Sequence, residues 1–175
     1  MASAYLTRTP SSASNMKTWT WSCWLKRSKL GSRQSASISG SLDGNNEQVL
    51  WFLADDTLKF NETADGVIAN VTTNRKFRDT NAWYHIVVAY DTTQSTASDR
   101  IKIYVNGTQE TSLSATTYPS QNHNGRINNN VLHHIGRTSS SHPNYFDGQM
   151  AHVHFVDGTA YTPSTFGETD TTTGI

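Results

Sequence analysis

The sequence predicts an all-β protein in which two antiparallel sheets pack face to face as a sandwich. Short runs that alternate apolar and polar residues recur from end to end, separated by turn-forming residues, and helical periodicity is almost absent. Charged residues make up 16% of the chain, below the roughly 25% of ordinary soluble domains. Ser, Thr, Asn and Gly fill the difference, as expected for a surface rich in strands and loops. Many short strands without helices between them favour packed antiparallel sheets.

The alternating runs give the order of the expected strands. The clearest ones lie at 19–26, 49–53, 57–61, 83–91, 100–106, 108–112, 131–135 and 149–157, and weaker ones at 5–7, 34–39 and 67–72. Asn106-Gly107 predicts a hairpin, because this pair accepts the positive φ angles of a two-residue turn. A second tight reversal is expected at 54–56. Thr162 and Pro163 could begin one or two helical turns.

The length favours one domain over the whole chain. A chain of 175 residues supports one substantial core and is short for two. We expect residues 1–14 to form an N-terminal edge segment and residues 167–175 a tail.

Residues 18–27, TWTWSCWLKR, hold three tryptophans that do not share one alternation. Trp19, Trp21, Cys23 and Leu25 point to one face of a strand, and Trp24 points to the other. Cys23 is therefore predicted to be a small buried apolar residue and not a nucleophile. As the single cysteine, it excludes an internal disulfide.

The charge balance limits the classes of partner. Fourteen basic residues match fourteen acidic ones, so neither nucleic acid nor an anionic membrane surface is an expected partner. No run approaches the roughly 18 apolar residues of a membrane-spanning helix, and the first residues lack the apolar core of a secretion signal.

Several segments taken together resemble a known family. NAWYHIVVAYD (81–91), IKIYVNGTQ (101–109), HHIGR (133–137) and YFDGQMAHVHFVDGTAYTPSTF (145–166), preceded by TWSCWLKR, resemble the laminin-G-like and pentraxin-like branch of the concanavalin A-like lectin/glucanase superfamily. The resemblance implies a jelly-roll sandwich and a lectin-like, carbohydrate-binding role.

The two ends of the chain carry a narrower resemblance. YLTRTPSSASNMKTWTWSCWLKR and FGETDTTTGI are similar to a version of the domain found in structural proteins of tailed bacteriophages. This implies a virion protein of a fibre, tail or capsid surface, such as a decoration protein. Its location would be the surface of the phage particle, assembled in the host cytoplasm.

The motif of the superfamily's glucanases is missing. They carry Glu-x-Asp-x-x-Glu on one strand, as nucleophile and acid/base. The nearest string here begins at Glu168 and Asp170, has Thr173 in place of the third carboxylate, and lies in the terminal tail. We therefore predict a protein that is not an enzyme, with a glycan-degrading enzyme as the alternative.

A calcium ion is the one cofactor that the sequence suggests. Asp43, Asn45 and Glu47 alternate in a polar loop, a spacing suited to an oxygen-ligated ion. The alternative is an ordinary Asp-Gly turn with solvated neighbours. His152 and His154 share a strand face but supply only two ligands, fewer than zinc requires.

The last prediction concerns the two faces of the strands. Between the sheets we expect Trp19, Trp21, Phe52, Ile103, Val153 and Phe155, with Ala151 on the same side of its strand as Val153, and Met150 and Val156 on the other. The opposite, outward face is predicted to include Trp24, Trp51, Leu53, Tyr104, His152 and His154. An apolar outer face is normally covered or used. Loops of the same chain, another subunit or a stacked sugar could cover it.

These observations predict a non-catalytic binding or assembly module. Its expected partners are other virion subunits, a cell-surface glycan, or both, and a homo-oligomer is an open alternative.

Overall fold

The computed structural model describes residues 4–43, 45–168 and 172, and it has two antiparallel sheets packed face to face, as the sequence predicts. No described helix is both long and apolar enough to cross a membrane. The helical hint at Thr162 is a single 3₁₀ turn, η2 (Pro163–Thr165), and a second short turn is η1 (Ala97–Asp99).

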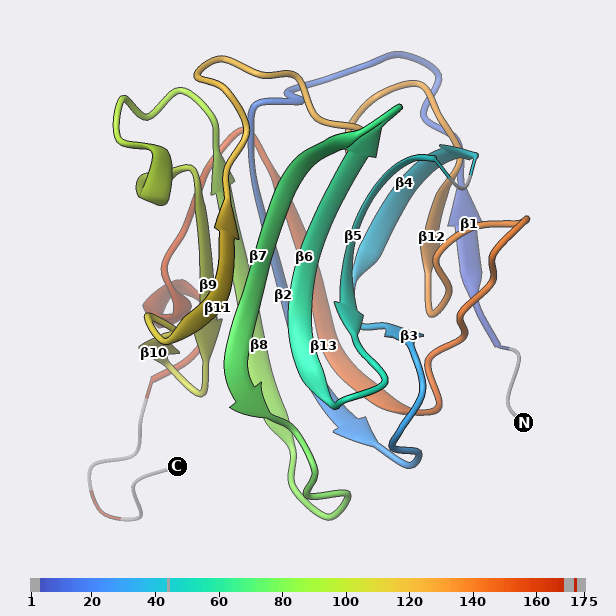
Figure 1. The fold of residues 1–175 in the computed structure, drawn as a ribbon, viewed down its shortest axis with the longest axis vertical. Helices are drawn as coiled ribbons and strands as arrows, with labels where there is room; N and C mark the ends of the chain where they lie inside the picture. The colour runs from blue at the N-terminus through green and yellow to red at the C-terminus, as the bar shows by residue number, and fades with distance from the viewer. Residues whose placement is uncertain (1–3, 44, 169–171, 173–175) are drawn as a thin grey trace.

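The larger sheet has eight strands. Its order is β1 (Leu6–Arg8), β12 (His133–Ile135), β4 (Ile38–Asp43), β5 (Asn46–Phe52), β6 (Thr57–Ala64), β7 (Val67–Lys76) and β11 (Leu113–Thr117), with β3 (Gln34–Ser35) paired beside β5. Figure 1 shows β4 to β7 of this sheet in front of the second layer.

The smaller sheet has five strands. Its order is β10 (Thr108–Gln109), β9 (Ile101–Val105), β8 (Tyr84–Asp91), β2 (Thr18–Arg27) and β13 (Gly148–Asp157). The strand with three tryptophans, β2, lies between β8 and β13 and is paired on both sides. Strands from both ends of the chain therefore meet in this layer, behind the larger sheet in Figure 1.

The core between the sheets is aromatic. Trp19 stacks on Tyr90 with ring centroids 4.9 Å apart and also contacts Phe60 and Phe155. Trp21, Cys23 and Phe52 are fully buried in the same cluster, and Ile103 is 2% exposed. Burial raises the pKa of the Cys23 thiol to about 12, which keeps the thiol protonated, as expected for a structural cysteine.

The local predictions agree with the structure at most strands. Asn106 and Gly107 have φ angles of 49° and 81°, as a hairpin turn of this kind requires. The predicted strand at 34–39 is divided between β3 and β4, and the strand β11 was not predicted. A run of Leu, Ser, Ala and Thr at 113–117 alternates too weakly to be recognised by its pattern.

The predicted orientation of β13 is wrong over its first half. Ala151 pairs with Trp24 and His154 with Ser22, so two residues of β13 lie opposite Cys23 alone. His152 has a φ of 48° at this β-bulge. A bulge adds one residue and reverses the alternation. Val153 is consequently 38% exposed and not part of the core.

The same bulge moves the neighbours of Val153. Met150, which was predicted to face outward, packs against the core together with Phe155. Ala151 was predicted to face the core and instead pairs with Trp24 on the outward side.

Buried polar groups connect the sheets to the long loop after β11. The carboxylate of Glu62 accepts hydrogen bonds from Tyr90 Oη (3.1 Å) and Gln48 Nε2 (2.9 Å), and His123 Nε2 lies 2.6 Å from its other oxygen. Gln48 Oε1 in turn accepts the backbone N–H of Ile127 at 2.8 Å. Because a buried carboxylate is costly unless it is hydrogen-bonded, this network fixes the loop over one end of the sandwich.

Candidate functional site

The predicted outward face is divided between the two sheets. Trp24, Tyr104 and His154 lie on strands of the smaller sheet, whereas Trp51 lies on β5 of the larger one and Leu53 directly follows it. Their side chains therefore face opposite sides of the sandwich. The single face expected from the sequence does not exist, because alternation along a strand shows which residues share a side but not which sheet the strand joins.

Trp51 is covered by its own chain. Its indole N–H donates to Thr138 Oγ1 at 3.0 Å, and the guanidinium of Arg33 lies 4.5 Å from its ring centroid. Trp51 is only 5% exposed, and its neighbour Val49 is fully buried on the same side. The segment after β12 thus covers this part of the larger sheet, which is the outcome expected if loops cover the outer face.

The chain after β13 folds back over the outer side of the smaller sheet. Gly158, with a φ of 82°, donates its N–H to Thr18 O at 3.0 Å. Thr20 Oγ1 then donates to Thr159 O at 2.6 Å and accepts the N–H of Tyr161 at 2.7 Å. One hydroxyl on β2 therefore holds two points of residues 158–168, the returning segment.

Aromatic contacts complete this cover. Phe166 stacks on His154 with centroids 5.9 Å apart, and Tyr161 meets the edge of Phe166 at 6.5 Å. His152 lies 6.4 Å from His154, and both histidines are exposed in the described structure. The returning segment covers one end of the outer surface and ends beside Trp24.

A cavity of about 670 Å³ lies between this segment and the sheet. Its aromatic lining consists of Trp24, Trp83, His85 and Phe166, and Trp24 stacks on His85 with centroids 5.0 Å apart at 20°. Trp83 is 38% exposed, so one indole remains open to solvent. The volume lies within the roughly 300–1,000 Å³ of ordinary ligand pockets.

Polar groups lie among these rings. Asn106, Ser164 and Glu168 line the cavity, and Gly107, Pro163 and Gly167 complete it. Asn106 Oδ1 accepts the backbone N–H of His85 at 2.8 Å, so the turn residue of the hairpin is held against the aromatic wall. Apolar walls with a few fixed polar groups are the usual construction of a small-molecule site. We take this aromatic cavity as the candidate site.

His85 is an uncharged part of the wall. Its Nε2 lies 2.9 Å from Ser22 Oγ, and the residue is 7% exposed. Burial, together with the nearby His154, holds the pKa of His85 below its usual value. The imidazole is therefore neutral at physiological pH and takes part as a hydrogen-bonding group.

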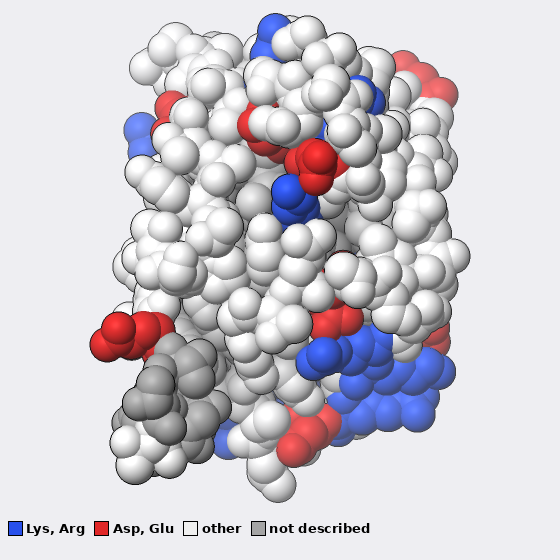
Figure 2. Space-filling model, turned by 90° about the vertical axis from the view of Figure 1, so that its left-hand side faces the viewer, with Lys and Arg blue, Asp and Glu red and all other residues white. Residues whose placement is uncertain are grey.

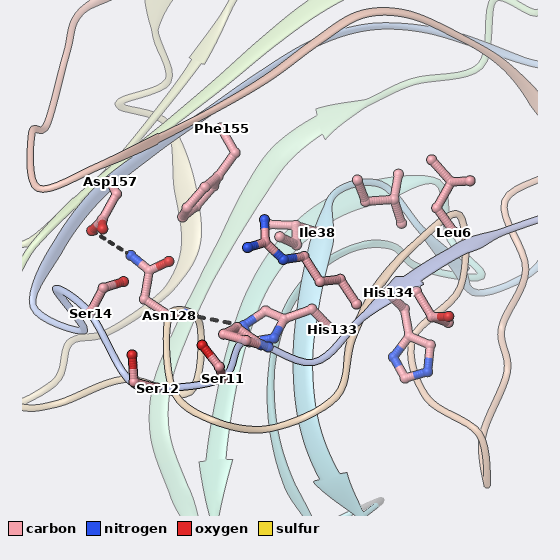
Figure 3. A pocket seen from close by; sticks show the side chains of 14 residues that line it. Leu6, Ser11, Ser12, Ser14, Ile38, Asn128, His133, His134, Phe155 and Asp157 are labelled. Carbon is pink, nitrogen blue, oxygen red and sulfur yellow. Dashed lines mark hydrogen bonds between the residues drawn. The ribbon is translucent and has the colours of Figure 1, made fainter.

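A second cavity, of about 680 Å³, lies at the open edge between β1, β12 and β13 (Figure 3). Asn128 donates its side-chain N–H to Asp157 Oδ1 at 2.8 Å and its backbone N–H to His133 Nε2 at 3.1 Å. His133 Nδ1 bonds Val131 O at 2.7 Å. Figure 3 shows His134 turned away from this group, as expected for adjacent strand residues. These polar groups bind one another, so the edge cavity is the weaker candidate.

No metal site forms among the side chains that the structure describes, since no three His, Cys, Asp or Glu residues gather closely enough to hold an ion. Of the calcium candidates, Asn45 is exposed in the β4–β5 turn and Glu47 is buried. The side chain of Asp43 lies outside the described part, as does residue 44. The calcium site therefore stays a prediction.

The formal charges of the chain sum to zero, and some of the charged side chains form ion pairs. In Figure 2 basic side chains gather mainly at one lower corner, with acidic ones beside them, and most of this face carries neither. At the end of β7, Arg75 pairs with Glu110 at 2.8 Å and Arg78 with Asp56 at 3.2 Å. The basic patch on this face is confined to that corner and does not extend across the face as a basic stripe would.

Two antiparallel sheets packed face to face define the β-sandwich class of domains. Residues 2–164 match the laminin G-type family model of the concanavalin A-like lectin/glucanases superfamily. The chain belongs to this superfamily. A search of curated proteins found no match.

Solved structures with the same fold come from several kinds of protein. The SAP-like pentraxin of Limulus polyphemus has a TM-score of 0.60 at 14% identity, over 98% of this chain and 77% of that one. Domain 4 of a GH43 arabinanase from Geobacillus stearothermophilus, in complex with arabinotriose, has a TM-score of 0.63 at 19% identity, over 87% and 66%. The CBM40 of a Ruminococcus gnavus sialidase, bound to α2,3-sialyllactose, has a TM-score of 0.58 at 10% identity, over 95% and 97%.

The likeness to these structures concerns the fold. The chain spans 42% of a matched Bacteroides ovatus protein and 66% of the arabinanase domain 4 chain.

Most of the aromatic cavity was not predicted. Trp24 was, but Trp83, His85, Asn106, Phe166 and Glu168 were not. A signal for His85 existed, because the run WYHIVVAY is apolar on both sides. Its place beside Trp24 depends on the pairing of β2 with β8, in which these two residues are partners.

Proposed function

We propose that this domain binds a glycan, without catalysis, in the aromatic cavity of the smaller sheet. The observation that carries the proposal is the set of Trp24, Trp83 and His85 rings beside the polar groups of Asn106 and Glu168. Sugar rings have apolar C–H faces that pack on aromatic side chains, while their hydroxyl groups require hydrogen-bonding partners. The cavity provides both.

Two of the matched structures are consistent with a glycan as the ligand class. One matched module is described bound to sialyllactose and another domain in complex with arabinotriose. Their identities of 10% and 19% transfer the fold and not the sugar, so the ligand must be argued from this chain's own residues.

The carboxylates support a binding role over hydrolysis. A glycosidase of the usual kind places two carboxylates across the scissile bond. Among the described residues that line the cavity, Glu168 is the only one with a carboxylate. Asp170, from the nearest motif string, lies outside the described residues. Glu62 is hydrogen-bonded between the sheets and only 2% exposed, away from any surface.

The test is a glycan array probed with the wild type and with Trp83→Ala. Because Trp83 is partly exposed, the variant should fold normally and lose most of its binding, by about tenfold or more, as expected when a stacking surface is lost. Val67→Ala, an exposed apolar residue on the larger sheet, is the matched control and should bind like the wild type. Binding that survives Trp83→Ala unchanged would exclude this cavity.

A second proposal concerns the setting of the domain. We propose that it is part of a tailed-phage virion, on the particle surface, where it contacts other subunits or a host glycan. The support is the resemblance of the opening and ending segments to phage structural proteins. Mass spectrometry of purified particles should detect the chain at a fixed ratio to known capsid or tail subunits. Its absence from intact particles would refute the proposal.

A homo-oligomer is the remaining expectation about partners. One matched relative is described as heptameric. Light scattering after size exclusion, over a range of concentrations, should give a mass above 19.4 kDa if the chain associates with itself.

A further inference from the structure

The wall of the aromatic cavity carries little formal charge. Within the described residues, Glu168 is the single carboxylate of the lining, and no lysine or arginine belongs to it. Lys26 follows Trp24 by two residues on β2 but lies outside the lining. Lys102, on β9, is paired with Asp99 at 3.0 Å. Among the described residues that line the cavity, none is a cation that could pair with a negatively charged group.

The hydrogen-bonding groups of the wall suit hydroxyl groups. The carboxylate of Glu168 accepts hydrogen bonds and cannot donate them when ionised. Asn106 Oδ1 is occupied by the N–H of His85 at 2.8 Å, which leaves the amide nitrogen of Asn106 as a donor. A sugar hydroxyl can donate to Glu168 and accept from Asn106. A sugar carboxylate can do only the second.

The physical cost of an acidic sugar in this cavity has two parts. Its carboxylate would lose water on entering an aromatic pocket without gaining a cation, and an unpaired buried charge is strongly unfavourable. It would also approach the negative charge of Glu168, which is solvent-exposed, so this repulsion adds a smaller, salt-screened cost.

We propose that the aromatic cavity selects uncharged sugars and rejects acidic ones such as sialic acid and uronic acids. The inference rests on the proposed glycan-binding function. It separates this chain from the matched module that is described bound to sialyllactose, although the two share a fold.

The experiment compares matched pairs of immobilised glycans that differ by one acidic sugar, beginning with lactose and α2,3-sialyllactose and extending to neutral and uronic-acid oligosaccharides. The wild type should bind the neutral member of each recognised pair at least about tenfold more tightly, a difference of roughly 1.4 kcal/mol. Added salt should reduce the ratio of neutral to acidic affinity, because salt screens the repulsion between Glu168 and the acidic sugar.

Two variants locate the origin of the preference. Glu168→Gln should reduce the ratio of neutral to acidic affinity and make that ratio less dependent on salt, because the repelling charge is gone. Lys26→Gln also removes one charge, but a positive one outside the cavity lining, and it should leave the ratio of neutral to acidic binding unaltered.

The outcomes separate this inference from the proposed function. Equal or tighter binding of acidic sugars, lost in Trp83→Ala, would overturn the selectivity and leave the glycan site in place. A neutral preference that Glu168→Gln does not change would also overturn the assigned cause. Failure of every glycan, neutral or acidic, to bind in a Trp83-dependent way would refute the glycan site and the selectivity with it.

Discussion

His134 should make the stability of this protein fall as the solution is acidified. It lies in β12 and is 2% exposed, and neither of its ring nitrogens has a hydrogen-bond partner. Burial, together with the charges of Arg137 and His133, lowers the pKa of His134 from 6.5 to about 4. The unfolded chain therefore takes up a proton at this residue near pH 6.5, while the folded chain resists until about pH 4.

The sign and size of the effect follow from proton binding. Between these two values the unfolded state binds more protons than the folded state, so the free energy of unfolding falls as the pH falls. Each unit of difference between the pKa values of the folded and unfolded states changes the free energy of unfolding by about 1.4 kcal/mol. A pKa lowered from 6.5 to about 4 thus corresponds to a loss of roughly 3 kcal/mol, complete once the pH is below both values.

His134→Leu tests this reasoning. Leucine removes the two unpaired nitrogens, so the variant should be as stable as the wild type near neutral pH or more so. Urea unfolding, followed by tryptophan fluorescence from about pH 7 to pH 4, should show a shallower loss of stability than in the wild type. His152→Asn, a change at an exposed histidine with positive φ that asparagine tolerates, should keep the wild-type slope. Identical slopes for His134→Leu and the wild type would refute the argument.

Three further predictions concern the core, the returning segment and calcium. Trp21→Ala should lower the free energy of unfolding by roughly 3–5 kcal/mol, whereas Val153→Ala, at the exposed bulge, should cost less than about 1 kcal/mol; similar losses in chemical denaturation would contradict the assigned orientation of β13. Thr20→Val removes the hydroxyl that holds Thr159 and Tyr161, so amide exchange over 159–166 should become faster than in the wild type; unchanged protection would show that the aromatic contacts suffice. A calcium ion in the β4–β5 turn should make the melting temperature higher in millimolar calcium than in chelator. Equal melting temperatures would refute the predicted calcium site.

The local structure of this chain follows from short sequence patterns. Neighbouring residues and backbone geometry are enough to specify the strands and the Asn106-Gly107 turn. They also specify that Trp24 points to the side of its strand opposite Trp19, Trp21 and Cys23. Phe52 and Ile103 also face the core as predicted. These features are short-range, so a pattern of a few residues is enough to specify them. The combined motifs were also sufficient to indicate the superfamily that the family model confirms.

The pairing of strands into two sheets determines which outward side chains meet. Trp24 and Trp51 have the same alternation in their strands, yet they lie on opposite sides of the sandwich, because β2 and β5 joined different sheets. The sheet that a strand joins depends on hydrogen-bond pairing between strands far apart in the chain. The residues next to one another within a strand do not specify that pairing.

The bulge and the cavity have the same origin. The extra residue at His152 is set by the pairing of β13 with β2, and it sends Val153 outward against the alternation of its own strand. The cavity joins Trp24, Trp83 and Phe166 only because the last segment returns over the sheet and is held by Thr20. Sequence patterns report the side of a strand, whereas a binding site requires the positions of several strands and a loop in space, and only the packed fold supplies these.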